Sequence, residues 1–238
     1  MLITTKAIII GSIKYGDTDL IVKAYTESGL KSYLIKRILK SKNGKLKTAY
    51  FQPLTQLEMI ASHNTKGNLN YIKEAKIINP YKSLSTQIKK QTIAIFLSEV
   101  LSKSLKEEES NPQLFEFLET SLIWLDTHDE VSNFHLLFLL QYSKHLGFYP
   151  DKEQVEYDFF SLEQGCFSEN LPRSSFITGR KLTLFKELLG INFDALNTLK
   201  FNGVERQEVL EILLEYFELH LPVFNRPKSL TILKSVFV

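Results

Sequence analysis

The chain has 238 residues, with 29 Lys and Arg against 27 Asp and Glu and a formal net charge of +2. Hydrophobic residues make up 44% of the sequence and charged residues 24%, which excludes a disordered or collagen-like chain. No apolar run approaches the ~20 residues of a membrane helix, the N-terminus lacks the features of a secretory signal, and the single cysteine, Cys166, excludes an intrachain disulfide. These features predict a cytoplasmic protein.

Charged and aromatic residues divide unevenly along the chain. Residues 1–80 contain 13 basic and 5 acidic side chains, a net charge of +8, whereas residues 81–238 contain 16 and 22, a net charge of −6. Sixteen of the 17 Phe and the only Trp follow residue 80. Because Asn-Pro favours a turn, we place a boundary at Asn79-Pro80 and predict two domains, 1–80 and 81–238.

The first domain repeatedly alternates apolar and polar residues with a period of two, which is typical of β-strands. The pattern predicts five strands, at residues 2–15, 20–25, 30–38, 54–61 and 69–78. Five short strands in about 80 residues indicate a small barrel of the oligonucleotide-binding (OB) kind. An SH3-like barrel would have a similar pattern, and periodicity alone does not distinguish the two.

After Pro80 the apolar residues recur with the 3.6-residue period of helices. We expect helices at residues 84–106, from Pro112, from a Thr127–Glu130 capping box through the apolar run Leu136–Leu140, and at 180–189, 205–221 and 229–237. Residues 158–173 break the pattern and are expected to form an irregular or hairpin-bearing insertion. The predicted fold is therefore an α+β two-domain protein, with an N-terminal five-stranded OB-fold β-barrel followed by an all-α C-terminal domain.

The sequence lacks the motifs of common enzymes, and we expect no catalytic activity. Residues 11–18, GSIKYGDT, have the glycine spacing of a phosphate-binding loop, but Asp17 stands at the lysine position, where a carboxylate would repel phosphate. There is no Gly-x-Ser-x-Gly or His-Glu-x-x-His motif. The five histidines do not fall at metal-ligand spacing.

The strongest functional signal is positive charge in residues 31–50, which contain seven basic side chains and no acidic one. Basic groups that follow phosphates, beside aromatic rings that stack on bases, are typical of sequence-tolerant single-strand binders. The affinity of such a surface falls steeply with salt because counterions are released on binding. A solvated lysine-rich loop is the alternative, and RNA or an acidic protein partner would also suit the charge.

On the predicted strands, Lys23 and Tyr25 share one face, and Lys31, Tyr33 and Arg37 share another, opposite to Leu34 and Ile38. Tyr15 is interpreted as either a core or turn residue or a contact. The candidate phosphate contacts are Lys23, Lys31, Lys36, Arg37, Lys40, Lys42, Lys45 and Lys47, and the candidate stacking platforms are Tyr25, Tyr33 and Tyr50.

Several motifs resemble the RecO family of recombination mediators. In the first domain they are Lys6-Ala7-Ile8-Ile9-Ile10, residues 14–22 (KYGDTDLIV), Tyr25-Thr26, Gly29-Leu30-Lys31, Lys36-Arg37, Gln52-Pro53-Leu54 and Leu57-Glu58. Near the C-terminus they are Arg206, Leu210, Leu213-Leu214, Tyr216, His220-Leu221, Lys228-Ser229-Leu230 and Leu233. Together they cover nearly the whole chain.

This resemblance implies an N-terminal OB domain that binds single- and double-stranded DNA and a helical C-terminal domain. It also implies that the protein anneals complementary strands coated by single-strand-binding protein (SSB) and helps RecR to load RecA, without covalent chemistry. The implied partners are DNA, RecR and the C-terminal tail of SSB, and the implied location is the nucleoid. The alternatives are an RNA-binding or ribosome-associated barrel protein and a protein adaptor without annealing activity.

The chain departs from the family in its irregular segment. Several family members have four cysteines in this segment and bind zinc there, whereas residues 158–173 contain only Cys166. One thiolate cannot hold structural zinc. We therefore predict a form without metal or other cofactor, in which the packing of Phe159, Phe160 and Phe167 holds the segment together.

Overall fold

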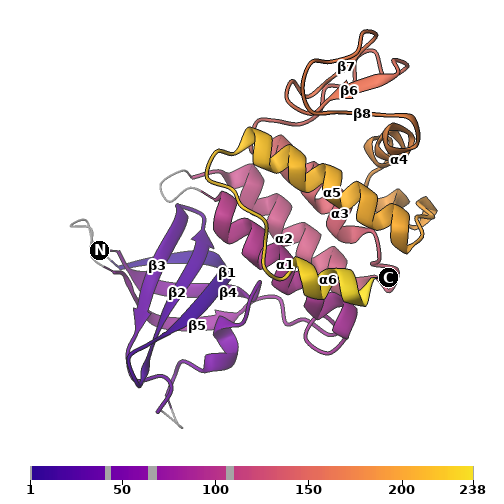
Figure 1. Ribbon diagram of the computed structural model, residues 1–238. Coiled ribbons are helices and arrows are strands. Elements are labelled where there is room, and N and C mark those ends of the chain that lie inside the picture. Colours follow the sequence, from indigo (N-terminus) through magenta and orange to yellow (C-terminus); the bar gives the residue numbers. More distant parts are fainter. Residues whose placement is uncertain (1, 41–43, 64–68, 106–109, 238) are drawn as a thin grey trace. The chain divides into compact units, whose positions relative to one another are not determined.

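A computed structural model describes residues 2–40, 44–63, 69–105 and 110–237, and the chain divides into two compact units, Met1–Thr127 and His128–Val238 (Figure 1). The first unit contains both strands and helices. Asn79-Pro80 lies between the last strand of the sheet, which ends at Ile77, and the first helix, which begins at Ile88. No helix in these four described ranges is long and apolar enough to cross a membrane.

The sheet of the first unit is antiparallel, with the strand order β3-β2-β1-β4-β5. Its strands are β1 (Leu2–Tyr15), β2 (Asp19–Thr26), β3 (Gly29–Ile35), β4 (Gln56–Ser62) and β5 (Tyr71–Ile77). One face buries a core that includes Ile9, Val22, Ala24, Tyr33 and Met59. All five predicted strands are thereby confirmed.

The ladders do not close the sheet into a barrel. Its edge strands β3 and β5 are linked by an isolated parallel bridge between Tyr33 and Asn70, where the Leu34 N–H donates to the Asn70 carbonyl at 2.8 Å. Further parallel pairing along β5 would require β3 to continue. β3 ends at Ile35, and Arg37 adopts a left-handed backbone conformation (φ 57°) that turns the chain away.

Two helices of the first unit, α1 (Ile88–Ser104) and α2 (Pro112–Thr127), follow the sheet, and a short 3-10 helix, η1 (Thr48–Phe51), connects β3 to β4. Helices α1 and α2 cover part of the outer sheet face, which is the face opposite to the core. Ile8, Tyr25 and Leu30 lie opposite one another on β1, β2 and β3, and all three are at most 1% exposed. The Tyr25 ring stacks on Phe115 of α2.

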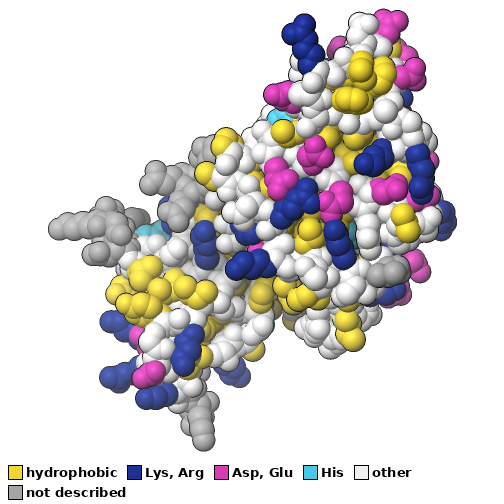
Figure 2. Space-filling model, viewed as in Figure 1, with side chains coloured by type: hydrophobic (Ala, Val, Ile, Leu, Met, Phe, Trp, Pro, Cys, Tyr) yellow, Lys and Arg dark blue, Asp and Glu magenta, His cyan; other side chains and the backbone are white. Residues whose placement is uncertain are grey.

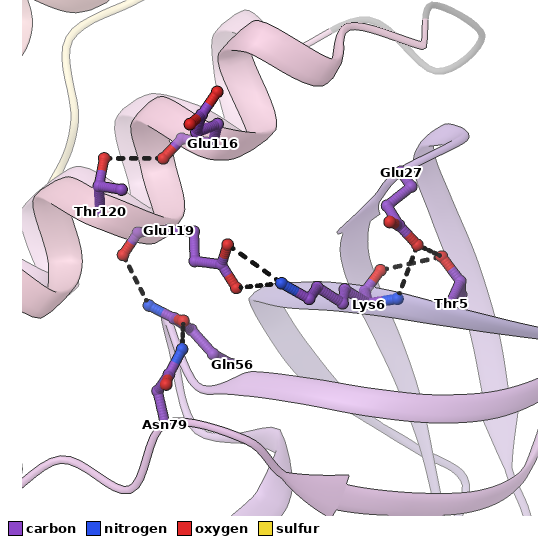
Figure 3. Close-up of polar contacts among 8 residues, drawn as sticks. All are labelled: Thr5, Lys6, Glu27, Gln56, Asn79, Glu116, Glu119 and Thr120. Carbon is purple, nitrogen blue, oxygen red and sulfur yellow. Dashed lines mark hydrogen bonds and ion pairs between the residues drawn. The ribbon is translucent and has the colours of Figure 1, made fainter.

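Polar contacts also join the sheet to α2 (Figure 3). The Lys6 ammonium forms an ion pair with Glu119 at 3.0 Å, and the Gln56 amide donates to the Glu119 carbonyl at 3.1 Å. The carboxylate of Glu27 accepts hydrogen bonds from the Thr5 hydroxyl and the Lys6 backbone N–H, both at 3.0 Å. Lys6 thus joins β1 to α2 within the first unit.

The segment between β5 and α1 is held to the end of α2 by a buried carboxylate. Asp126 accepts backbone hydrogen bonds from Lys82, Ser83 and Leu84 at 2.9, 2.8 and 2.7 Å. Burial raises the pKa of Asp126, but these N–H donors outweigh it and hold the pKa below its ordinary value. The fully buried ammonium of Lys90 donates to the Asp126 carbonyl at 2.8 Å. The cluster satisfies each of these buried polar groups.

The second unit is mainly helical. Its helices are α3 (Phe134–His145), α4 (Gly179–Leu189), the 3-10 helix η2 (Phe193–Thr198), α5 (Gly203–His220) and α6 (Leu230–Val236). It also contains a small antiparallel sheet with the order β7-β6-β8, formed by β6 (Phe159–Ser161), β7 (Cys166–Ser168) and β8 (Phe176–Thr178). The all-α prediction is wrong in this respect, because residues 158–173 form a β6–β7 hairpin to which β8 adds a third strand.

The predicted capping box at Thr127–Glu130 is also wrong. Thr127 is the last residue of α2, where its hydroxyl donates back to the Ile123 carbonyl at 3.0 Å, and α3 begins only at Phe134. A capping box is present instead at α5. The Glu205 N–H donates to the Asn202 side chain at 3.0 Å, and the Asn202 N–H donates to the Glu205 carboxylate at 2.9 Å.

Aromatic packing holds the small sheet together and joins it to α4, as predicted from Phe159, Phe160 and Phe167. The ring centroid of Phe160 lies 5.0 Å from that of Phe167 and 4.9 Å from that of Phe185 on α4, and all three rings are buried. Phe159 packs edge-on against Phe176 at 5.8 Å. Within the described part of the chain, no group of three or more His, Cys, Asp or Glu side chains could hold a metal ion.

Candidate nucleic-acid interface

Part of the outer sheet face is left open by α1 and α2. Ile13, Ile21 and Leu34 lie opposite one another across β1, β2 and β3, in what we call the apolar row. Ile13 is 64% exposed, and the other two are half-buried. Figure 2 shows hydrophobic side chains gathered over β2 and β3 with Lys and Arg side chains beside them. Nonpolar groups with basic neighbours suit a ligand that has flat rings and a charged backbone.

A β-bulge produces the apolar row. The pairing of β1 with β2 shifts between Ile9 and Gly11, so Ile9 faces the core whereas Ile13, four residues later, faces outward. The glycine within the strand was the signal for this bulge. Sequence reasoning that assumed strict alternation therefore missed Ile13 as an exposed residue.

Tyr15 and Lys23 lie on the same open face. Tyr15 is 54% exposed and pairs with Asp19 at the end of β1, and Lys23 lies between Gly11 and Ser32 in the row next to the apolar row. Tyr15 is thus an exposed aromatic ring on this face, where the sequence left a core or turn role open. Lys23 is half-buried and lies on the same face of β2 as Tyr25, as predicted.

Tyr25 and Tyr33 are not available as stacking platforms, which corrects their assignment. Tyr25 is 1% exposed because Phe115 covers it, and Tyr33 is fully buried in the core on the opposite face. The Tyr33 hydroxyl is hydrogen-bonded to Nε2 of His63 at 2.8 Å, and burial raises the pKa of Tyr33 well above its ordinary value. A base cannot stack on a ring that the fold already covers. Tyr50 is half-buried and packs against the same core.

The prediction that Tyr33 faces away from the apolar side is wrong for the same reason. Tyr33 points into the core, and its neighbour Leu34 points outward in the apolar row. Both faces of β3 carry apolar residues, so alternation alone could not decide which face is inside. Lys31 lies opposite Ala24 on the core side of the sheet, separate from Lys23.

The basic residues after β3 fall into two groups. Lys36, Arg37 and Lys40 are exposed directly after the strand that carries Leu34, and the Lys36 ammonium lies 5.5 Å from the centre of the Tyr71 ring. The second group is Lys45 and Lys47, both exposed. Lys45 forms an ion pair with Glu74 of β5 at 3.3 Å, and Lys47 precedes η1. Lys42 lies outside the described residues.

The turn between β1 and β2 contacts the basic segment. A carboxylate oxygen of Asp19 accepts a hydrogen bond from the Arg37 backbone N–H at 2.8 Å and another from the Thr18 hydroxyl. The Leu39 N–H donates to the Thr18 carbonyl at 2.9 Å. The Arg37 N–H and the Thr18 hydroxyl hold the pKa of Asp19 below its ordinary value, so this carboxyl group is ionised at neutral pH.

Comparison with known proteins gives a consistent result over the whole chain. Residues 1–81 match the family model described as Recombination protein O N terminal, and residues 85–230 match Recombination protein O C terminal. The chain is 49% identical to the DNA repair protein RecO of Flavobacterium psychrophilum and 47% identical to that of Christiangramia forsetii, in each case over all of both chains. The protein of the same name from Bacteroides fragilis (strain YCH46) is 37% identical, again over both full lengths.

The 49% identity over the full length of the chain, together with matches to the N-terminal and C-terminal family models, agrees with the resemblance found in the sequence motifs. The chain belongs to the RecO family.

Proposed function

We propose that this protein is a recombination mediator in DNA repair, which binds DNA, anneals complementary SSB-coated strands and assists RecR in loading RecA. Its family and the names of its relatives support the role in repair. The observation that carries the binding step is the apolar row beside exposed basic residues on the open sheet face. It acts where DNA is repaired, at the nucleoid.

Binding is sequence-tolerant because each contact addresses a feature that all nucleotides share. Lys23, Lys36, Arg37 and Lys40 neutralise phosphates, while the apolar row and Tyr15 accept unstacked bases. Lys31, Lys42, Lys45 and Lys47 are further candidate phosphate contacts outside this centre, and Tyr50 is a further candidate aromatic contact. None of these contacts uses the pattern of donors and acceptors on base edges.

Annealing follows from the same surface. Two strands repel each other through their phosphates, and a protein that neutralises both lowers this barrier without making or breaking a covalent bond. The mediator is therefore non-enzymatic. Contacts with RecR and with the SSB tail are part of the proposal.

The sheet supports the choice of an OB-type domain. Its strand order and the approach of β3 to Asn70 ahead of β5 correspond to a five-stranded, partly open OB barrel, in which the β2–β3 face binds oligonucleotides. We propose residues 1–80 as this domain and residues 81–238 as the helical domain.

Fluorescence anisotropy tests the binding step. Labelled single-stranded DNA, duplex DNA and RNA of equal length are titrated with the protein across a salt series. We expect binding to DNA whose log Kd rises linearly with log salt. No salt-dependent binding to DNA, or clearly tighter binding to RNA, would contradict the proposal, the latter in favour of an RNA-binding role.

A further inference from the structure

Asp17 and Asp19 are carboxylates in the turn beside the proposed DNA-binding surface. Asp17 lies in the turn after β1, and Asp19 is the first residue of β2, where it pairs with exposed Tyr15. A negative charge close to bound phosphates repels them, so by charge alone each residue should weaken DNA binding. The two differ in their contacts. In the described chain Asp17 is exposed and its carboxylate makes no hydrogen bond, whereas Asp19 is bonded to the backbone of Arg37.

Arg37 is held in an unfavourable conformation at this contact. Its φ of 57° lies in the left-handed region, which is energetically unfavourable for a residue with a side chain. The hydrogen bond from its N–H to Asp19 offsets part of this cost, because an ionised acceptor forms a stronger bond than a neutral one.

The same turn fixes the residues on either side. The Leu39 N–H bonds to the Thr18 carbonyl, and the side chain of Ile38 is 5% exposed and belongs to the core. The backbone from Arg37 to Leu39 is therefore held in place by contacts with β2, the turn before it and the core. This fixes the positions from which the exposed side chains of Lys36, Arg37 and Lys40 project.

We propose that Asp19 is a positioning residue for DNA binding, whose carboxylate holds the Arg37 backbone so that Lys36, Arg37 and Lys40 project together toward the phosphates. The inference rests on the proposed function of this surface. A fixed group of cations binds without first losing conformational freedom, which is why ordering a segment in advance strengthens binding. The benefit of order exceeds the repulsion of one carboxylate, an oxygen of which already accepts hydrogen bonds from the Arg37 N–H and the Thr18 hydroxyl.

The sign of the effect separates positioning from simple electrostatics. We compare Asp19→Ala with the matched variant Asp17→Ala, which removes an identical charge from the same turn. Anisotropy with a single-stranded oligonucleotide should give Asp19→Ala a Kd about threefold or more above that of the wild type, and Asp17→Ala a Kd equal to or below it. Equal Kd values for the two variants would overturn the inference.

Two further variants exclude a purely structural effect. Asp19→Asn keeps an oxygen that accepts the Arg37 N–H, so it should restore binding to within about twofold of the wild type. In an Arg37→Gly background the left-handed conformation is unstrained, so Asp19→Ala should then raise Kd by a smaller factor. An unchanged factor in that background, or Asp19→Asn binding as weakly as Asp19→Ala, would contradict positioning through Arg37.

These outcomes are distinct from failure of the proposed function. If the wild-type protein does not bind DNA in a salt-dependent way, the proposed function fails before any variant is compared. If the wild type binds but Asp19→Ala and Asp17→Ala behave alike, only the role of Asp19 is wrong.

Discussion

The ring of Tyr25 on β2 stacks on the ring of Phe115 on α2, with centroids 6.1 Å apart and planes inclined by 23°. This contact marks where the helices stop covering the outer sheet face. Tyr25 is buried, whereas Ile21 and Lys23, which precede it on the same face, are only half-buried. One face of one strand therefore both packs against α2 and contributes to the proposed DNA-binding surface.

Tyr15→Ala should weaken binding to single-stranded DNA without destabilising the fold. Tyr15 is 54% exposed, so its ring contributes little to the core. Stacking of a base on an aromatic ring contributes about 1–3 kcal/mol, so Kd should rise about fivefold or more. Anisotropy measures Kd, and a Kd equal to that of the wild type would exclude Tyr15 as a stacking platform.

Tyr25→Ala should have the opposite profile. Removing a buried ring that packs on Phe115 should destabilise the first unit by about 3–5 kcal/mol. Trp124, the only tryptophan of the chain, lies on α2 in the same unit, so its fluorescence during urea unfolding reports this loss. Below the unfolding transition the variant should bind DNA as the wild type does. Weaker binding by fully folded Tyr25→Ala would indicate that this ring contacts DNA.

Replacing Lys36, Arg37 and Lys40 together by Ala should lower the salt dependence of binding. Each phosphate contact with single-stranded DNA contributes about 0.7 to the slope of log Kd against log salt, so the slope should fall by about 2. Lys89→Ala is the control, because Lys89 is exposed on α1 rather than beside the apolar row. A slope equal to that of the Lys89→Ala protein would show that these three residues do not contact phosphates.

Asp126→Ala should destabilise the first unit by about 3 kcal/mol or more, because three backbone N–H groups lose the carboxylate that accepts their hydrogen bonds. The pKa of Asp126 is lowered in the folded protein, so its contribution is present above the unfolded pKa and is lost as pH falls through the folded pKa. Urea unfolding followed by Trp124 fluorescence should show this loss in the wild type at acidic pH.

Glu116→Ala is the matched control for this measurement, because Glu116 is an exposed carboxylate on the same helix. Its replacement should change the free energy of unfolding by no more than about 0.5 kcal/mol. The role of Asp126 would be contradicted if the two variants had the same stability.

His135→Leu should reduce the sensitivity of the second unit to acid. Burial, with a smaller effect of Arg206, lowers the pKa of His135 to about 3. In the unfolded chain this histidine takes up a proton near its ordinary pKa of about 6.5, whereas in the folded chain it does not. The histidine therefore does not affect the free energy of unfolding above that pH, and it lowers this free energy progressively as pH falls toward 3. Thermal unfolding between pH 7.5 and 4.5, followed by circular dichroism, should give a flatter pH dependence for the variant. An unchanged dependence would contradict the prediction.

Purified protein should contain well below one zinc ion per chain, and EDTA should not change its Tm. The small sheet is held by packing of Phe160 against Phe167 and Phe185. Phe160→Ala should therefore destabilise the second unit by about 3–5 kcal/mol. Stoichiometric zinc that is lost with Cys166→Ala would contradict this account.

The sequence was sufficient to predict the strands and most helices, because each has its own period. It also located the positive charge in the first third of the chain. It did not predict which tyrosines are exposed, since Tyr25 is covered by Phe115, about 90 residues later in the sequence. Nor did it predict the face of Tyr33 or of Ile13, because apolar residues line both faces of β3 and a bulge shifts the alternation in β1.

The contact between Asp19 and Arg37 shows the same limit. Both residues belong to motifs found in the sequence, but the left-handed conformation of Arg37 and its bond to a strand 18 residues earlier follow only from the three-dimensional structure.

The most direct test of the central claim is the rate at which complementary SSB-coated oligonucleotides anneal, measured by fluorescence quenching with and without the protein. We expect the wild type to accelerate annealing, and the variant with Ala at positions 36, 37 and 40 to lose most of the acceleration, with the effect decreasing as salt rises. A rate with the wild-type protein that equals the rate without it would contradict the proposal that this protein anneals DNA.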